Sequence, residues 1–125
     1  MAKSVTRKKS ILVVDDDEDL IFLLSTRLKK LGYNVQSCIG GIGLVDILLK
    51  FKPFLLLLDI SMQAENGAEL CQEIKKIPVL KNTKIILMSG NHNIAEHAAA
   101  CDADDYISKP LSLDLINSTV MKHMV

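Results

Sequence analysis

Short apolar runs recur along the chain, and each is followed at once by a polar residue. Residues 10–14, 54–58 and 84–88 each contain at least four consecutive apolar residues, which is typical of strands covered on both faces of a parallel sheet. Residues 33–38 alternate between polar and apolar side chains, as in an edge strand, and a fifth short strand fits at residues 106–107. The pattern predicts a five-stranded sheet with a buried centre.

The segments between these strands have the apolar spacing of helices. Asp17 suits the N-cap of a first helix, and Gly32 is a helix stop signal directly before the next strand. The apolar stripe expected on this helix is Leu20, Leu23, Leu24, Leu28 and Leu31. Further helices are expected at residues 42–51, 67–76, 94–100 and 113–124. Regular alternation of strands and helices predicts right-handed crossovers and an α/β fold with a doubly wound parallel sheet flanked by five helices.

Acidic residues gather where ligands bind in such a sheet, at the carboxyl ends of the strands. Asp15, Asp16 and Asp17 follow the first strand and Asp59 follows the third. Two carboxylates about 4 Å apart repel by roughly 4 kcal/mol at an effective dielectric constant near 20, and Mg²⁺ would offset this because it prefers oxygen ligands. The alternative, that Asp16 and Asp17 only cap a helix and Asp59 belongs to a turn, stays open for each residue taken singly.

Two further polar residues are expected at the same edge. Ser89 follows the fourth strand and Lys109 follows the fifth. A lysine and a metal ion together stabilise the oxygens of a transferred phosphoryl group, and a carboxylate such as Asp59 can accept that group as an acyl phosphate. The set indicates a phosphoryl-transfer site without a nucleotide pocket.

Composition limits the classes of binding partner and the cellular location that can be expected for this chain. The 125 residues suit one domain, and 15 Lys and Arg against 15 Asp and Glu give a net charge of zero. The only basic cluster lies in the first ten residues, so direct nucleic-acid binding is not expected. Neither a membrane span nor a secretory signal is present, which favours a cytoplasmic protein without a membrane partner. Cys38, Cys71 and Cys101 are interpreted as small buried apolar residues.

Four motifs occur in a fixed order: ILVVDDD at residues 11–17, LLLLDISM at residues 55–62 with Gly67 beyond it, IILMSG at residues 85–90 and DYISKP at residues 105–110. In this order and spacing the chain resembles the receiver domain of two-component response regulators. The resemblance covers about residues 10–124. It implies the flavodoxin-like strand order 2-1-3-4-5, with a receiver domain at residues 10–125 after a flexible basic tail at residues 1–9.

The resemblance also implies roles for the residues at the strand ends. Asp59 would be the phosphoacceptor, supplied by a sensor histidine kinase or a histidine phosphotransfer protein. Asp15, Asp16 and Asp59, with the backbone carbonyl of Ser61, would hold Mg²⁺.

Ser89 and Lys109 would contact the phosphoryl oxygens, and Ser89 and Tyr106 would form the switch that changes a docking surface. The Lys109–Pro110 peptide bond would be cis. The protein would act on a downstream target as a monomer or a phosphorylation-dependent dimer. It would not be an enzyme beyond promoting its own phosphotransfer and dephosphorylation.

The chain departs from the family pattern at two places. Gln63 stands where a proline is usual, and Asp102 stands where a glycine is frequent, so backbone strain is expected at Asp102. Neither change removes a functional group.

Two other classes of protein share part of this pattern. A haloacid-dehalogenase-like phosphohydrolase needs a second aspartate two residues after the nucleophile, where this chain has Ser61, and is a larger protein. A phosphorylation-independent receiver-like interaction module usually lacks the acidic pair, the acceptor or the lysine, all of which are present. The sequence leaves open whether the chain acts alone or belongs to a longer protein.

Overall fold

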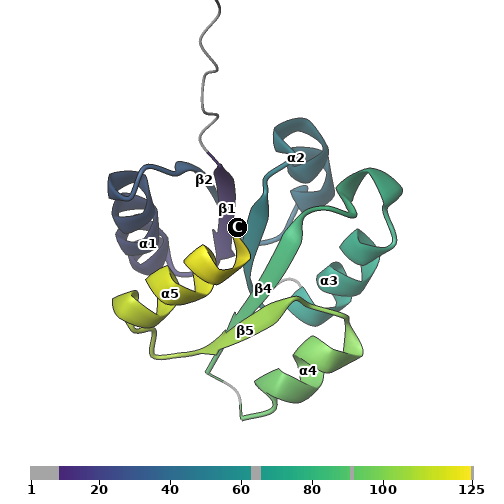
Figure 1. Ribbon diagram of the computed structural model, residues 1–125. Coiled ribbons are helices and arrows are strands. Elements are labelled where there is room, and N and C mark those ends of the chain that lie inside the picture. Colours follow the sequence, from purple (N-terminus) through teal and green to yellow (C-terminus); the bar gives the residue numbers. More distant parts are fainter. Residues whose placement is uncertain (1–8, 63–65, 91, 125) are drawn as a thin grey trace, which may run out of the picture.

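The computed structural model describes residues 9–62, 66–90 and 92–124. Five parallel strands form one sheet in the order β2-β1-β3-β4-β5, as the family resemblance implied (Figure 1). Residues 1–8, most of the expected tail, and Gln63 lie outside the described residues. The strands are β1 (Ser10–Asp15), β2 (Asn34–Ile39), β3 (Leu55–Asp59), β4 (Lys84–Ser89) and β5 (Asp105–Ser108).

The polar residues expected just after three of the strands are the last residues of those strands. Asp15 is in register with Ile39, and Asp59 is in register with Met88. Ser89 pairs in the same way with Ser108. Backbone pairing continues through these residues, which fixes the direction of their side chains more firmly than a loop would.

Helices cover both faces of the sheet. In Figure 1, α1 and α5 lie on one side and α2, α3 and α4 on the other. The helices are α1 (Glu18–Lys30), α2 (Leu44–Phe51), α3 (Gly67–Lys75), α4 (Ile94–Ala100) and α5 (Leu113–His123). A short 3-10 helix, η1 (Pro78–Leu80), was not predicted.

The first helix begins as expected but buries a different stripe. Asp17 is its N-cap, and its side chain accepts hydrogen bonds from two backbone N–H groups. Leu23 and Leu31 are 49% and 43% exposed, so their place in the predicted stripe was wrong. Leu23 lies about 100° around the helix from Leu24, and Leu31 lies beyond the last helical residue as the C-cap. The buried residues of the helix are Ile21, Leu24 and Leu28.

The core consists of two clusters, one on each face of the sheet. Side chains from α2, α3 and α4 pack on one face, and side chains from α1 and α5 pack on the other. Residues 55–58 are fully buried, as the unbroken apolar run predicted. Burying a leucine side chain contributes about 1.5–3 kcal/mol, so the central strands hold the site rigidly.

The structure also tests the predictions for one peptide bond, one backbone conformation and the three cysteines. The Lys109–Pro110 peptide bond is cis, as the resemblance implied. Asp102 has a φ of 59°, the left-handed conformation expected where a glycine is missing. Cys71 and Cys101 are buried, whereas Cys38 is only half-buried because it lies on the edge strand.

Candidate functional site

The carboxyl ends of the three central strands place three polar side chains in the interior. Asp15 ends β1, Asp59 ends β3 and Ser89 ends β4, and their exposed fractions are 1%, 3% and 0%. Buried carboxylates are costly unless they are paired or hydrogen-bonded. Their presence at neighbouring strand ends therefore marks this edge as the candidate site.

Lys109 bridges the two buried carboxylates. Its Nζ lies 3.0 Å from Oδ2 of Asp15 and 3.5 Å from Oδ1 of Asp59. The backbone positions this lysine, because the Lys109 N–H donates to the Ser89 carbonyl at 2.8 Å. One ammonium faces two carboxylates, so negative charge remains in excess at this point.

Asp59 has a raised pKa. Burial is the main cause, and the nearby charge of Asp15 adds to it. The Ser61 N–H, which donates to Oδ1 of Asp59 at 3.1 Å, and the Lys109 ammonium act in the opposite direction without overcoming burial. The site therefore gains most from any group that brings positive charge to Asp59.

Gly67, the first residue of α3, lies directly against the end of β3. A Cβ added at Gly67 would lie 2.3 Å from the Asp59 carbonyl oxygen and 2.5 Å from the Ile60 Cα. Asn66 caps α3 through hydrogen bonds to two backbone N–H groups and forms an isolated bridge with Ser61. The start of α3 is thus packed directly against the backbone of the phosphoacceptor candidate.

A contact that the sequence analysis missed joins Ser61 to Ser89. Their hydroxyl oxygens lie 3.3 Å apart. The resemblance gave a role only to the Ser61 backbone carbonyl and none to its hydroxyl. A serine two positions after an acceptor aspartate was the available signal, since its hydroxyl can reach the neighbouring strand end.

The remaining predicted site residues lie farther out. Asp16 is half-buried, and Asp17 is exposed at the helix cap. The Asp17 backbone N–H donates to Oδ1 of Asp15 at 3.0 Å, which helps to orient that carboxylate. Tyr106 is 43% exposed on β5.

The oxygen donors at this edge suit a magnesium ion bound by few protein ligands. Within the described ranges, no three His, Cys, Asp or Glu side chains are grouped closely enough to hold a metal by themselves. Magnesium is usually held by one or two carboxylates, with waters and phosphate oxygens completing its shell. Two buried carboxylates that share one ammonium meet that requirement.

The fold and the family comparison define a signalling domain. Residues 11–121 match the response regulator receiver domain family, and the chain belongs to that family. Receiver domains of two-component systems receive phosphoryl groups from histidine kinases, and they are signalling domains rather than classical enzymes.

Solved structures agree with this assignment. The Thermotoga maritima response regulator TrrA, solved in complex with Mg²⁺ and BeF, is 30% identical over 93% of this chain and 99% of its own, with a TM-score of 0.83. A signal receiver domain from Bermanella marisrubri is 28% identical over 95% of this chain and 100% of its own, with a TM-score of 0.86. The Vibrio cholerae chemotaxis protein CheY4, 19% identical over 94% of this chain and 100% of its own, shares the fold with a TM-score of 0.87.

No helix in the part of the chain that the structure describes has the length and apolar character needed to cross a membrane.

Proposed function

We propose that the chain accepts a phosphoryl group on Asp59 in a Mg²⁺-dependent reaction and thereby switches a docking surface. The donor is a sensor histidine kinase or a histidine phosphotransfer protein in the cytoplasm. The observation that carries this proposal is the bridge of Lys109 between the buried carboxylates of Asp15 and Asp59, at 3.0 Å and 3.5 Å.

The acceptor oxygen follows from the hydrogen bonds of Asp59. Oδ1 accepts from the Ser61 N–H and faces Lys109, so we assign Oδ2 as the nucleophile. It attacks the phosphorus of a phosphohistidine, an O–P bond forms, the P–N bond breaks, and the imidazole leaves and takes up a proton. Lys109 then turns its ammonium toward the new phosphoryl oxygens.

A metal ion would be held by the carboxylates of Asp15, Asp16 and Asp59 and by the Ser61 carbonyl. When bound, Mg²⁺ supplies positive charge to the phosphoryl oxygens. The chain's own contribution is the rigid placement of Asp15, through the Asp17 N–H at 3.0 Å, and of Asp59, through the Ser61 N–H at 3.1 Å.

The switch begins at Ser89. Its hydroxyl, 3.3 Å from the Ser61 hydroxyl, exchanges this contact for a phosphoryl oxygen, and the half-exposed Tyr106 on the neighbouring strand follows inward. Moving a two-state element from 1:99 to 99:1 requires roughly 5.5 kcal/mol of differential binding. A doubly charged group bound by a metal, an ammonium and a hydroxyl is of the right order.

The test is incubation with acetyl phosphate and Mg²⁺, followed by intact-mass measurement. The parent protein should gain one phosphoryl group that hydroxylamine removes, and chelation of Mg²⁺ should prevent the gain. Asp59→Asn should gain none, whereas Asp17→Asn, altered only at the helix cap, should react like the parent. Equal labelling of Asp59→Asn would refute the assignment.

A second measurement tests the switch. Ser89→Ala should still accept the phosphoryl group but show smaller backbone NMR shifts around Tyr106 and α4 than the parent. If phosphorylation leaves the parent spectrum in that region unchanged, the chain does not switch through this surface.

A further inference from the structure

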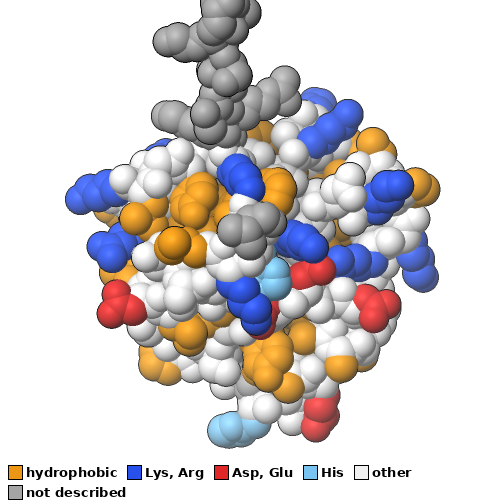
Figure 2. Space-filling model, viewed as in Figure 1, with side chains coloured by type: hydrophobic (Ala, Val, Ile, Leu, Met, Phe, Trp, Pro, Cys, Tyr) orange, Lys and Arg blue, Asp and Glu red, His pale blue; other side chains and the backbone are white. Residues whose placement is uncertain are grey.

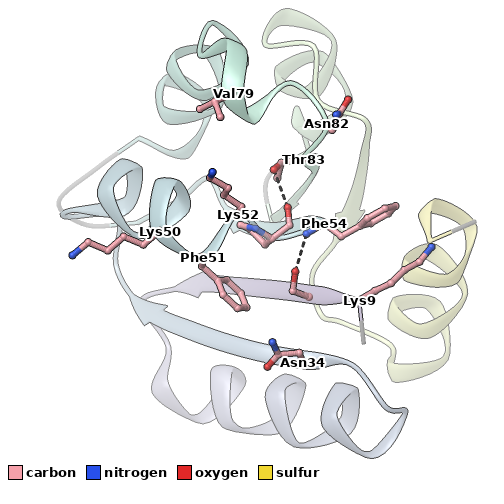
Figure 3. Close-up of a pocket in the computed structure, with 11 residues that line it drawn as sticks. Lys9, Asn34, Lys50, Phe51, Lys52, Phe54, Val79, Asn82 and Thr83 are labelled. Carbon is pink, nitrogen blue, oxygen red and sulfur yellow. Dashed lines mark hydrogen bonds between the residues drawn. The ribbon is translucent and has the colours of Figure 1, made fainter. Parts of the chain in front are cut away.

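A cavity of about 840 Å³ opens at the amino-terminal ends of the strands, at the opposite end of the sheet from Asp59. Figure 3 shows that it lies between the end of α2, the segment leading into β3 and the segment before β4. The volume falls within the range of about 300–1,000 Å³ that is usual for small-molecule sites.

Hydrogen bonds between strand starts make the floor of this cavity rigid. The Phe54 N–H donates to the Ser10 carbonyl at 2.9 Å and lies 3.1 Å from its hydroxyl oxygen. The buried Thr83 hydroxyl donates to the Pro53 carbonyl at 2.8 Å. Both side-chain contacts are drawn in Figure 3. The cavity is therefore formed before any ligand binds.

The charge of the cavity is entirely positive. Lys9, Lys50 and Lys52 line it, and no acidic residue among those that the structure describes does. Lys9 is already engaged, since its ammonium lies 4.4 Å from the centroid of the Phe54 ring and donates to the Met124 carbonyl. Within the described ranges, the salt bridges found do not include Lys50 or Lys52, so these two cations can receive an anion.

The surface around the cavity has the same sign. Figure 2 shows Lys and Arg side chains mainly over the upper half of the molecule, around the end where the chain enters β1, and acidic side chains mainly lower. The last turns of α1 and α5 add basic residues, among them Arg27, Lys30 and Lys122. Basic side chains therefore predominate around this end on the face shown, where they would attract an anion from solution.

Lys52 lines the cavity and has an unusual backbone conformation. It is the C-cap of α2 with a φ of 46°, a left-handed position that normally favours glycine or asparagine. Figure 3 shows its side chain rising between Phe51 and Val79. A lysine at this position keeps a charge in the cavity where glycine would be less strained.

The cavity also offers a flat apolar surface and amide groups. Phe51 and Phe54 are half-buried and line it. Figure 3 shows the Phe51 ring directed toward Asn34 at the start of β2. An aromatic ring beside an amide and two unpaired ammonium groups matches a ligand that joins a heteroaromatic ring to a polyanion.

We propose that this cavity binds a nucleoside di- or triphosphate. The base lies against Phe51 with its polar edge toward Asn34, and the phosphates lie at Lys52. The two ends of the sheet are separate, so this site and Asp59 can be occupied together.

The test uses ATP as the probe in the presence of EDTA, which removes any metal that could bring phosphates to Asp59. Saturable binding by calorimetry should accompany backbone NMR shifts at residues 50–54 and 82–83. Lys52→Gln should weaken binding by up to about fivefold, the upper end of the range for an exposed ion pair. Phe51→Leu should weaken it at least about fivefold through lost stacking.

Two control variants and one further lining variant test whether ATP binds at this cavity and not elsewhere on the chain. Lys122→Gln on α5 changes a lysine that does not line the cavity and should bind like the parent. Asp59→Asn should also bind ATP normally, which makes the result independent of the proposed function. Asn82→Asp alters an exposed lining residue and should weaken binding by charge alone, even if Phe51→Leu folds poorly.

Two probes test the ligand class. Adenosine, which lacks the charge, and inorganic tripolyphosphate, which lacks the ring, should each bind at least about tenfold more weakly than ATP. The proposal is overturned if millimolar ATP does not saturate, if the shifts map to Asp59, or if tripolyphosphate binds as tightly as ATP.

Discussion

Replacing Lys109 by methionine should reveal the electrostatic repulsion between the buried carboxylates of Asp15 and Asp59. Methionine keeps most of the aliphatic length but removes the ammonium that lies 3.0 Å from Asp15 and 3.5 Å from Asp59. The two carboxylates, 1% and 3% exposed, would then repel each other without compensation. We expect the variant to be clearly less stable than the parent at pH 7 without a divalent cation.

The magnitude follows from the two distances. At an effective dielectric constant near 20, each contact corresponds to about 5 kcal/mol of Coulomb attraction. The lysine recovers hydration when it is lost, and its side chain is 26% exposed, so solvent screens part of this attraction. Breaking one partner of a buried ion pair costs about 3–5 kcal/mol, and with that discount we expect a loss of about 2–3 kcal/mol.

Urea unfolding followed by circular dichroism in EDTA measures the loss. Lys81→Met is the matched control, because Lys81 is exposed and should change stability by less than about 0.5 kcal/mol. Adding Asp15→Asn to Lys109→Met should restore at least about 1 kcal/mol by removing one of the unpaired charges. A Lys109→Met variant as stable as the Lys81→Met control would show that the bridge carries no net free energy.

Three further predictions concern residues around the site. Burial alone would raise the pKa of Asp104, but hydrogen bonds from Lys75 and a backbone N–H lower it below its ordinary value of 3.8; its stabilising contribution is therefore present above about pH 4 and lost as the pH falls through the folded pKa. Urea unfolding followed by circular dichroism at a series of pH values should show that the parent and Asp104→Asn differ in free energy of unfolding, and that this difference disappears below about pH 4. A difference that does not depend on pH would contradict this. Gly67→Ala should lower the free energy of unfolding in urea by about 2 kcal/mol, because the new Cβ would lie 2.3 Å from the Asp59 carbonyl oxygen. An unchanged urea midpoint would mean that α3 can move away from the end of β3 without loss of stability. Asp102→Gly should stabilise the protein by about 0.5 kcal/mol by relieving the φ of 59°, while Asp102→Ala should bring no gain in thermal unfolding.

The sequence was sufficient for most of the fold because its signals are local and strong. Unbroken apolar runs identified the buried strands, and Asp17 and Gly32 marked the two ends of the first helix. The exposed Leu23 was misplaced because apolar character alone does not say which of two adjacent leucines faces the sheet. That choice depends on the angle at which α1 crosses β1 and β2, which is a tertiary property.

The sequence predicted which residue types form the site and at which edge of the sheet they lie, but not which side chains contact one another. Strand-end aspartates, Ser89 and Lys109 could be placed at one edge, since parallel strands share a direction. That Lys109 would bridge both carboxylates, and that the Ser61 and Ser89 hydroxyls would meet, depends on side-chain geometry after a turn. The cavity at the opposite end of the sheet was missed altogether, because its residues come from four separate segments with no shared motif.

Chemical trapping of the acyl phosphate shows whether Asp59 carries the phosphoryl group. After treatment with acetyl phosphate and Mg²⁺, borohydride reduces an aspartyl phosphate to homoserine, which peptide mass spectrometry can locate. We expect homoserine at position 59 alone, and none when Mg²⁺ is chelated. Homoserine at Asp15 or Asp16, or an unmodified Asp59 in a protein that has gained a phosphoryl group, would contradict it.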